Sequence, residues 1–143
     1  MSIFFYNEDV DFPDLQYERI NKILKSELRR AKMKLGVVNY IFCSDDYLLS
    51  INIQFLKHNF YTDVITFDYT SDRVVSGDIY ISTDRVCNNS LTFGQNISNE
   101  FVRVISHGLL HLLKFNDKEE DDIVAMRAAE DRLIEKFLNL SNV

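Results

Sequence analysis

Cysteine is scarce in this sequence, and the two cysteines that it contains lie far apart. Cys43 and Cys87 do not belong to a Cys-x-x-Cys motif, and no further cysteine is present. Disulfide frameworks and zinc sites need closely spaced or more numerous cysteines. We therefore predict two buried free thiols and assign a function to neither of them.

A targeting or anchoring segment is also missing from the sequence. The first residues, MSIFFYNEDVDF, have no basic lead and only a short apolar run before the acidic residues. This pattern fits neither a signal peptide nor a membrane span. The sequence has no repeats, linkers or low-complexity segments. It therefore predicts a cytoplasmic protein without membrane contact, folded as a single domain over residues 1–143.

The sequence has no excess of positive charge, since its formal net charge is −6. This balance argues against nucleic-acid binding through overall charge, which needs a field that attracts phosphates. A local exception lies between Leu15 and Leu35, where apolar residues follow helical spacing. The other side of this predicted helix carries the basic residues Lys22, Lys25, Arg29 and Lys32. We interpret this basic stripe as a solvated face, with phosphate contact as the alternative.

Apolar residues are plentiful enough for one core, because 46% of the chain is hydrophobic, including 11 Phe and 7 Tyr. The pattern of β-branched and aromatic residues predicts strands near the start (SIFFY) and at 37–43, 62–67 and 77–82. The segment between the last two strands is polar and has no Gly-rich phosphate loop.

Five helices are predicted between and after these strands, and their ends follow from capping residues. The first is opened by Pro13 and closed by Gly36. The second can be capped by Ser44, Asp45 and Asp46 and runs through Tyr47 to Phe55. The others start at Ser82 or Thr83, at Ser98, and at the acidic residues 119–122. The predicted buried stripe of the last helix consists of Met126, Ala129, Leu133, Phe137 and Leu140. Together these elements predict an α+β fold with a small mixed sheet.

Two of the three histidines occur in one short segment, ISHGLLHLLKFNDK, residues 105–118. Residues i and i+4 of a helix project from the same face, so His107 and His111 can offer two imidazoles to one ion. Leu109 and Leu112 then point into the core. The spacing predicts a helix that carries half of a metal site.

A third candidate ligand follows the helix, because Asp117 lies six residues after His111. We expect the helix to end at Asn116 in a left-handed conformation. Two imidazoles and one carboxylate leave a fourth position for water, as in catalytic zinc sites. The position after the first histidine is Gly108, whereas HExxH peptidases need a glutamate there as general base. The sequence thus argues against peptide hydrolysis.

Four segments together resemble one known family. HGLLHL, with a ligand six residues after the second histidine, resembles H-G-x-L-H-L-x-G-Y-D-H, the signature of the YbeY endoribonuclease and rRNA maturation factor family. Residues 52–67, NIQFLKHNFYTDVITF, resemble its L-N-x-x-(Y/F)-R-x-x-D-x-x-T-D-V-L-S-F block. GDIYIS and MRAAED also match that family, in the expected order.

The resemblance implies a zincin-like α+β domain with a four-stranded sheet and a metal site on its central helix. Its metal ligands carry over to His107, His111 and Asp117, holding one zinc ion per chain and a reactive water. The implied activity is that of a single-strand-specific, metal-dependent endoribonuclease that matures the 3′ end of 16S rRNA in ribosome assembly and quality control. The implied partners are an rRNA precursor, small-subunit ribosomal proteins, the GTPase Era and an exoribonuclease.

The sequence departs from the family pattern at three positions: Asp117 replaces a histidine, Lys114 a glycine and Leu56 an arginine. Leucine cannot replace the arginine as a phosphate partner. Lys57 and His58 are the nearest candidates to compensate, unless they are ordinary exposed loop residues.

Three questions stay open at this stage. Asp63 and Asp78 are better explained as structural residues than as catalytic ones, and no residue is identified as a general acid. Zinc is the preferred metal, although nickel, cobalt or iron would bind similar donors. The alternative function is a non-catalytic ribosome-assembly factor that binds pre-rRNA or a ribosomal protein and uses the metal structurally. A metallohydrolase acting on another substrate is a third interpretation.

Overall fold

A mixed four-stranded sheet divides the molecule into two unequal layers. The computed structural model describes residues 2–140. The strands are β1 (Ser2–Asn7), β2 (Lys34–Cys43), β3 (Val64–Asp68) and β4 (Val74–Ser82). Their order in the sheet is β1-β2-β4-β3; β1, β2 and β4 are parallel, and β3 pairs antiparallel with β4 at the edge. The predicted α+β fold with a mixed four-stranded sheet is confirmed.

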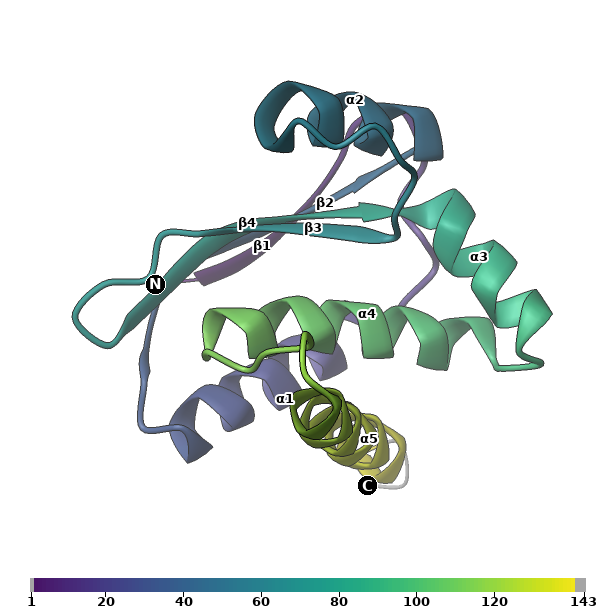
Figure 1. Cartoon of the computed structure of the whole chain (residues 1–143). Helices are drawn as coiled ribbons and strands as arrows, with labels where there is room; N and C mark the ends of the chain where they lie inside the picture. Colours follow the sequence, from purple (N-terminus) through teal and green to yellow (C-terminus); the bar gives the residue numbers. More distant parts are fainter. Residues whose placement is uncertain (1, 141–143) are drawn as a thin grey trace.

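The helices cover the two faces of the sheet unevenly. They are α1 (Tyr17–Arg30), α2 (Asp45–Leu56), α3 (Thr83–Thr92), α4 (Ile97–Leu112) and α5 (Glu120–Leu140). Helix α2 lies alone over one face, whereas α1, α4 and α5 lie on the opposite side, with α4 nearest the sheet (Figure 1). None of these helices within residues 2–140 is long and apolar enough to cross a membrane.

Capping side chains set the starts of three helices. Ser44 and Ser82 accept hydrogen bonds from the backbone N–H groups of Tyr47 and Arg85, as the sequence predicts. Helix α4 begins earlier than predicted, because Asn96 rather than Ser98 is its N-cap and accepts from the N–H of Asn99. The cap therefore lies two residues before the expected position.

Both predicted ends of the first helix are wrong. Pro13 lies before the helix, in an irregular segment that connects the end of β1 to α1, and its carbonyl accepts a hydrogen bond from the Tyr17 hydroxyl. Gly36 does not close the helix but lies in β2, where the pairing with β4 shifts register between Leu35 and Val38. A glycine at such a bulge lets another backbone approach closely. The chain instead leaves α1 through Lys32, whose φ is 57°.

Helix α4 is fixed to the sheet and to the other helices by one buried face. Val102, Ile105, Leu109 and Leu112 have no exposed surface, which confirms the predicted inward direction of the two leucines. The buried Tyr40 hydroxyl of β2 donates to the Ile105 carbonyl at 2.8 Å. Because this face is held so firmly, the direction of the opposite, histidine-bearing face is also fixed.

The final helix packs against α4 and α1. Met126, Ala129, Leu133 and Phe137 are buried as predicted, but Leu140 is 38% exposed and does not belong to the buried stripe. Cys43 and Cys87 are both free, although Cys87 is only half-buried. Burial raises the pKa of the Cys43 thiol to about 12, which keeps it protonated and unreactive.

The basic stripe of α1 borders a groove between α1 and α5. Lys22, Lys25 and Arg29 line this groove together with Lys136 of α5. Lys32 is exposed beyond the end of α1, so the prediction that it belongs to the helical stripe is wrong. The groove belongs to the helical side of the molecule and does not include the histidine pair.

Candidate metal centre

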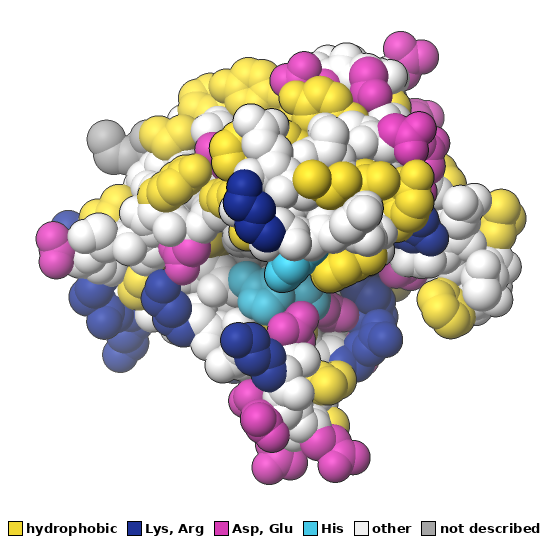
Figure 2. Space-filling view, turned by 45° about the horizontal axis from the view of Figure 1, so that its top comes forward, with side chains coloured by type: hydrophobic (Ala, Val, Ile, Leu, Met, Phe, Trp, Pro, Cys, Tyr) yellow, Lys and Arg dark blue, Asp and Glu magenta, His cyan; other side chains and the backbone are white. Residues whose placement is uncertain are grey.

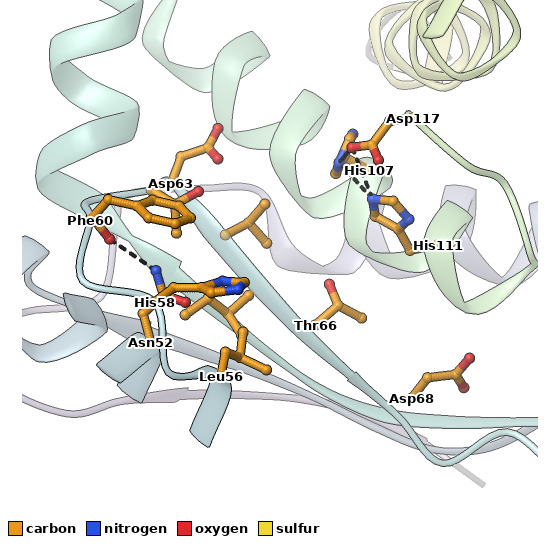
Figure 3. A pocket seen from close by; sticks show the side chains of 13 residues that line it. Asn52, Leu56, His58, Phe60, Asp63, Thr66, Asp68, His107, His111 and Asp117 are labelled. Atoms are coloured by element: carbon orange, nitrogen blue, oxygen red, sulfur yellow. Dashed lines mark hydrogen bonds and ion pairs between the residues drawn. The ribbon is translucent and has the colours of Figure 1, made fainter. Parts of the chain in front are cut away.

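The three candidate ligands converge at the C-terminal end of α4. The Nε2 atoms of His107 and His111 are 3.0 Å apart, and Oδ2 of Asp117 lies 3.5 and 3.4 Å from them. One ligand atom from each residue lies within 4.8 Å of the others. Figure 3 shows the two imidazoles on α4 and the carboxylate entering from the following loop. The structure thus brings together the donors that the sequence predicts as ligands.

These separations fit a small tetrahedral cation. Donors about 2.0–2.1 Å from a zinc ion and separated by the tetrahedral angle lie about 3.3 Å from one another. The observed values of 3.0, 3.4 and 3.5 Å are close to this separation. Imidazole and carboxylate are also donors that divalent transition metals accept. The donor set therefore fits such an ion, without identifying which one.

The other nitrogen of each imidazole is already engaged. His107 Nδ1 is 2.6 Å from Oε2 of Glu130, and His111 Nδ1 is 3.1 Å from the Phe115 carbonyl. A carboxylate and a carbonyl only accept hydrogen bonds, so both histidines are assigned a proton on Nδ1. In neutral imidazoles this assignment directs the Nε2 lone pairs toward each other and toward Asp117. A cation between the three donors would relieve their mutual repulsion.

Glu130 of α5 is the central residue of the network behind the histidines. Its side chain is 7% exposed, and Oε1 accepts a hydrogen bond from Arg103 at 2.9 Å, while Arg103 also pairs with Asp131 at 2.6 Å. Burial alone would lower the pKa of His107, but the hydrogen bond and charge of Glu130, together with Asp117 and Asp63, raise it. Carboxylates behind metal-ligating histidines commonly fix the ring orientation in this way.

Sequence reasoning gave Glu130 no role. The residue lies within MRAAED, a segment that the family resemblance includes, and this was the available signal. Its contact with His107 depends on how α5 packs against α4, which no local spacing encodes.

The loop that carries Asp117 turns at Lys114. This residue has φ 73°, so the predicted left-handed position at Asn116 is wrong by two residues. The N–H of Phe115 bonds to the Leu110 carbonyl at 2.9 Å, which closes the helix end. A lysine thus adopts, where the family pattern has glycine, a conformation that glycine favours. Its ammonium pairs with Asp68 of β3 at 2.8 Å and ties the loop to the sheet edge.

One side of the candidate metal centre opens into a pocket of about 470 Å³, which we call the β3 pocket. It is lined by β3 residues, by Asn52 and Leu56 of α2, by His58 and Phe60, and by the three candidate ligands. Leu56 is 39% exposed. Of the two predicted compensating residues, His58 lines this pocket, whereas Lys57, which caps α2, is not among the described residues that do.

A second pocket of about 410 Å³ lies on the other side of the site, and we call it the α5 pocket. Asp63, Val64, His107 and Asp117 line both pockets. The α5 pocket also contains Phe93, Glu100, Arg103 and Arg127. Burial raises the pKa of Glu100, although Arg103 and Arg127 partly oppose this effect. Figure 2 shows the histidines at the bottom of a hollow with both acidic and basic side chains around it.

The two aspartates outside the ligand set have different surroundings. Asp78 of β4 accepts a hydrogen bond from the Asn39 side chain of β2 at 3.0 Å, as expected for a structural residue. Asp63 offers its carbonyl to Ser82 at 2.9 Å, while its side chain lies beside both pockets.

The mixed sheet, the helix with both histidines and the acid beyond its end define an α+β protein with a candidate metal centre. A family model, described as endoribonuclease YbeY, matches residues 3–138. The chain belongs to the endoribonuclease YbeY family, which confirms the resemblance found in the sequence.

Curated relatives and a solved structure agree with this assignment. Endoribonuclease YbeY of Parabacteroides distasonis is 40% identical over 134 residues, which cover 94% of each chain. Its counterpart in Cytophaga hutchinsonii is 42% identical over 131 residues, covering 91% of this chain and 92% of that protein. The solution structure of a Thermotoga maritima protein is similar with a TM-score of 0.71 and 24% identity, covering 98% of this chain and 91% of that one. This last similarity supports the fold alone.

Proposed function

We propose that this chain is a metal-dependent endoribonuclease that cuts single-stranded rRNA precursors during maturation of the 3′ end of 16S rRNA. The observation that carries the proposal is the convergence of two imidazole Nε2 atoms and one carboxylate in a surface hollow. The relatives named endoribonuclease YbeY support the same activity. We further propose that residues 1–143 form one metallohydrolase domain that acts in the cytoplasm.

His107, His111 and Asp117 would hold the metal, for which we propose one zinc ion per chain. When bound, such an ion supplies Lewis-acid chemistry at a phosphate oxygen. Glu130 holds the His107 ring in its ligating orientation. Arg127 lines the α5 pocket with a 62% exposed side chain whose ion pair with Glu130 is a long contact at 3.8 Å, so it is suited to neutralise a phosphate beside the site. Arg103 is less available because two acids already hold it.

A non-catalytic ribosome-assembly factor is the second candidate function. It is supported by Leu56, which lines the β3 pocket at the position where the family pattern has arginine, and by the net charge of −6. Family membership and the access to the candidate centre from two pockets favour the enzyme. Binding to small-subunit proteins, to Era or to an exoribonuclease stays a prediction.

The test of the proposed activity compares wild-type protein and His111→Ala, purified in the same way. Each protein is stripped of metal, reloaded separately with zinc, nickel, cobalt or iron, and incubated with an end-labelled single-stranded rRNA precursor or its duplex. We expect metal-dependent cleavage of the single strand by the wild type only. Equal cleavage by both proteins would identify a contaminating nuclease. Binding without cleavage under every metal would support the assembly factor.

A further inference from the structure

The wall of the β3 pocket carries an exposed pair of stacked rings. The centroids of His58 and Phe60 are 5.2 Å apart and their planes differ by 20°. Phe60 is 56% exposed, so a ligand can reach its ring from the pocket. Both rings line the pocket together with the candidate metal ligands, as Figure 3 shows. An exposed flat apolar surface beside a reactive centre indicates a ligand with a flat ring.

Asn52 fixes the segment that bears these rings through hydrogen bonds. This residue of α2 is only 1% exposed, and its side-chain amide donates to the Phe60 carbonyl at 2.9 Å. The backbone carbonyl of Asn52 accepts hydrogen bonds from the backbone N–H groups of Lys57 and His58, the latter at 3.1 Å. The two rings are thus positioned before any ligand arrives, which reduces the entropy lost on binding.

The charge distribution separates the roles of the two pockets. Within residues 2–140, no lysine or arginine lines the β3 pocket, whereas Asp63 and Asp68 do. The lining arginines, Arg103 and Arg127, belong to the α5 pocket. Phosphate is therefore favoured on the α5 side, and an uncharged ring on the β3 side. Unpaired nucleobases stack on aromatic side chains, largely regardless of base identity.

We propose that the His58–Phe60 pair is the stacking platform for an unpaired base next to the phosphodiester that is cut. This inference rests on the proposed function and deepens it, because it names specificity-determining residues of the same site. A base within a duplex stays stacked on its neighbours and cannot use this platform. The platform would make the protein itself select single strands.

The test is a double-mutant cycle between protein and RNA. Phe60→Leu removes the aromatic face but keeps an apolar side chain, and a series of fluorescent single-stranded RNAs each lacks one base. Dissociation constants are measured by anisotropy for the metal-free full chain, and KM and kcat for the metal-loaded chain. Phe55→Leu is the matched control, because Phe55 is also 56% exposed but is absent from the described lining of both pockets.

We expect Phe60→Leu to weaken binding of intact RNA by about 5- to 150-fold, the range measured for loss of one base–aromatic stack. Phe60→Trp should restore the affinity and Phe55→Leu should leave it unchanged. Removing the base at one position should cost the wild type the same factor and cost Phe60→Leu nothing. Unchanged affinity for intact RNA in Phe60→Leu would overturn the platform. So would a Phe60→Leu variant that still loses the full wild-type factor when a base is removed, whichever base that is.

The outcomes separate this inference from the proposed function. Coupling between Phe60 and one base without any cleavage would retain the platform and reject the nuclease. Metal-dependent cleavage without coupling would retain the nuclease and reject the platform. A wild-type chain that neither binds nor cuts single-stranded RNA would reject both.

Discussion

Asp117 differs from the neighbouring acidic residues in what its carboxylate faces. Its Oδ2 lies within 3.5 Å of both imidazole Nε2 atoms, whereas Asp121 and Asp122 belong to the first turn of α5. We expect Asp117→Ala to lose bound metal, while Asp121→Ala and Asp122→Ala keep it. Asp117→His should keep it as well, because imidazole is an equally suitable zinc donor.

Metal content and thermal stability of these four variants should be measured on the same preparations. If Asp117 served only as a helix cap, alanine would cost about 1 kcal/mol of stability and leave the metal content intact. Full occupancy in Asp117→Ala would therefore contradict its role as a ligand.

Substitution of Glu130 shows how much the orientation of the ligand His107 contributes to metal affinity. Glu130→Gln keeps the shape of the side chain but removes the charge that faces His107 Nδ1 at 2.6 Å. We expect about 10- to 100-fold weaker metal binding, as is typical when the partner of a ligating histidine is changed. Competition with a chromogenic chelator gives the dissociation constant. Glu119→Gln, on the exposed segment before α5, is the matched control, and equal affinity in both variants would limit Glu130 to a structural role.

At the level of elements, α4 approaches the sheet closely at Gly108. A Cβ atom there would lie 2.8 Å from Cγ2 and 3.0 Å from Cδ1 of Ile79. Gly108→Ala gains helix propensity worth about 1 kcal/mol but overpacks the core by about 1–3 kcal/mol. We therefore expect a net loss of about 1 kcal/mol in the free energy of unfolding, measured with denaturant.

The background variant Ile79→Ala separates the two contributions. With the isoleucine carbons removed, Gly108→Ala should no longer destabilise the protein, because only the gain in propensity remains. A loss of equal size in both backgrounds would mean that contact with Ile79 is not the cause.

Elements could be predicted from sequence where a short-range contact decides them. Ser44 and Ser82 cap the residues that follow them, and each is one of the candidate capping residues that the sequence predicts. The role of Gly36 was not predicted, because it depends on the neighbouring strand β4, where a Cβ atom on residue 36 would collide with the Ser76 hydroxyl. The candidate metal centre likewise combines short-range features with contacts between elements distant in sequence. His107 and His111 are predictable from one helical turn, but the contact with Glu130 requires the packing of α5 on α4.

For the whole molecule, net charge and local charge lead to different expectations for RNA binding. The net charge is −6, and the arginines that line the described pockets beside the site are Arg103 and Arg127. Because Arg103 is already held by Glu130 and Asp131, one phosphate contact, at Arg127, is expected on a single strand. It gives a slope of log affinity against log salt of about −0.7. We expect this shallow slope, and Arg127→Gln should make it shallower by about 0.7 and weaken binding.

The basic stripe on α1 provides the comparison. If it is a solvated face, the double variant Lys22→Glu and Lys25→Glu should keep the slope of the wild type. A shallower slope together with weaker binding in that variant would show that the stripe contacts RNA and that the site extends across the helical side of the molecule.

All three candidate ligands lie within residues 107–117, so one short stretch of chain contains the whole donor set. Closing so short a loop costs little conformational entropy. The ion can therefore be captured before the strands have paired, and a chain that binds it early has the C-terminal turn of α4 already formed. We expect metal to speed folding more than it slows unfolding, as contacts formed in the transition state would do, and stopped-flow refolding and unfolding with and without metal measures both rates. Glu130, which arrives with α5, would complete the site only after the rest of the protein has folded.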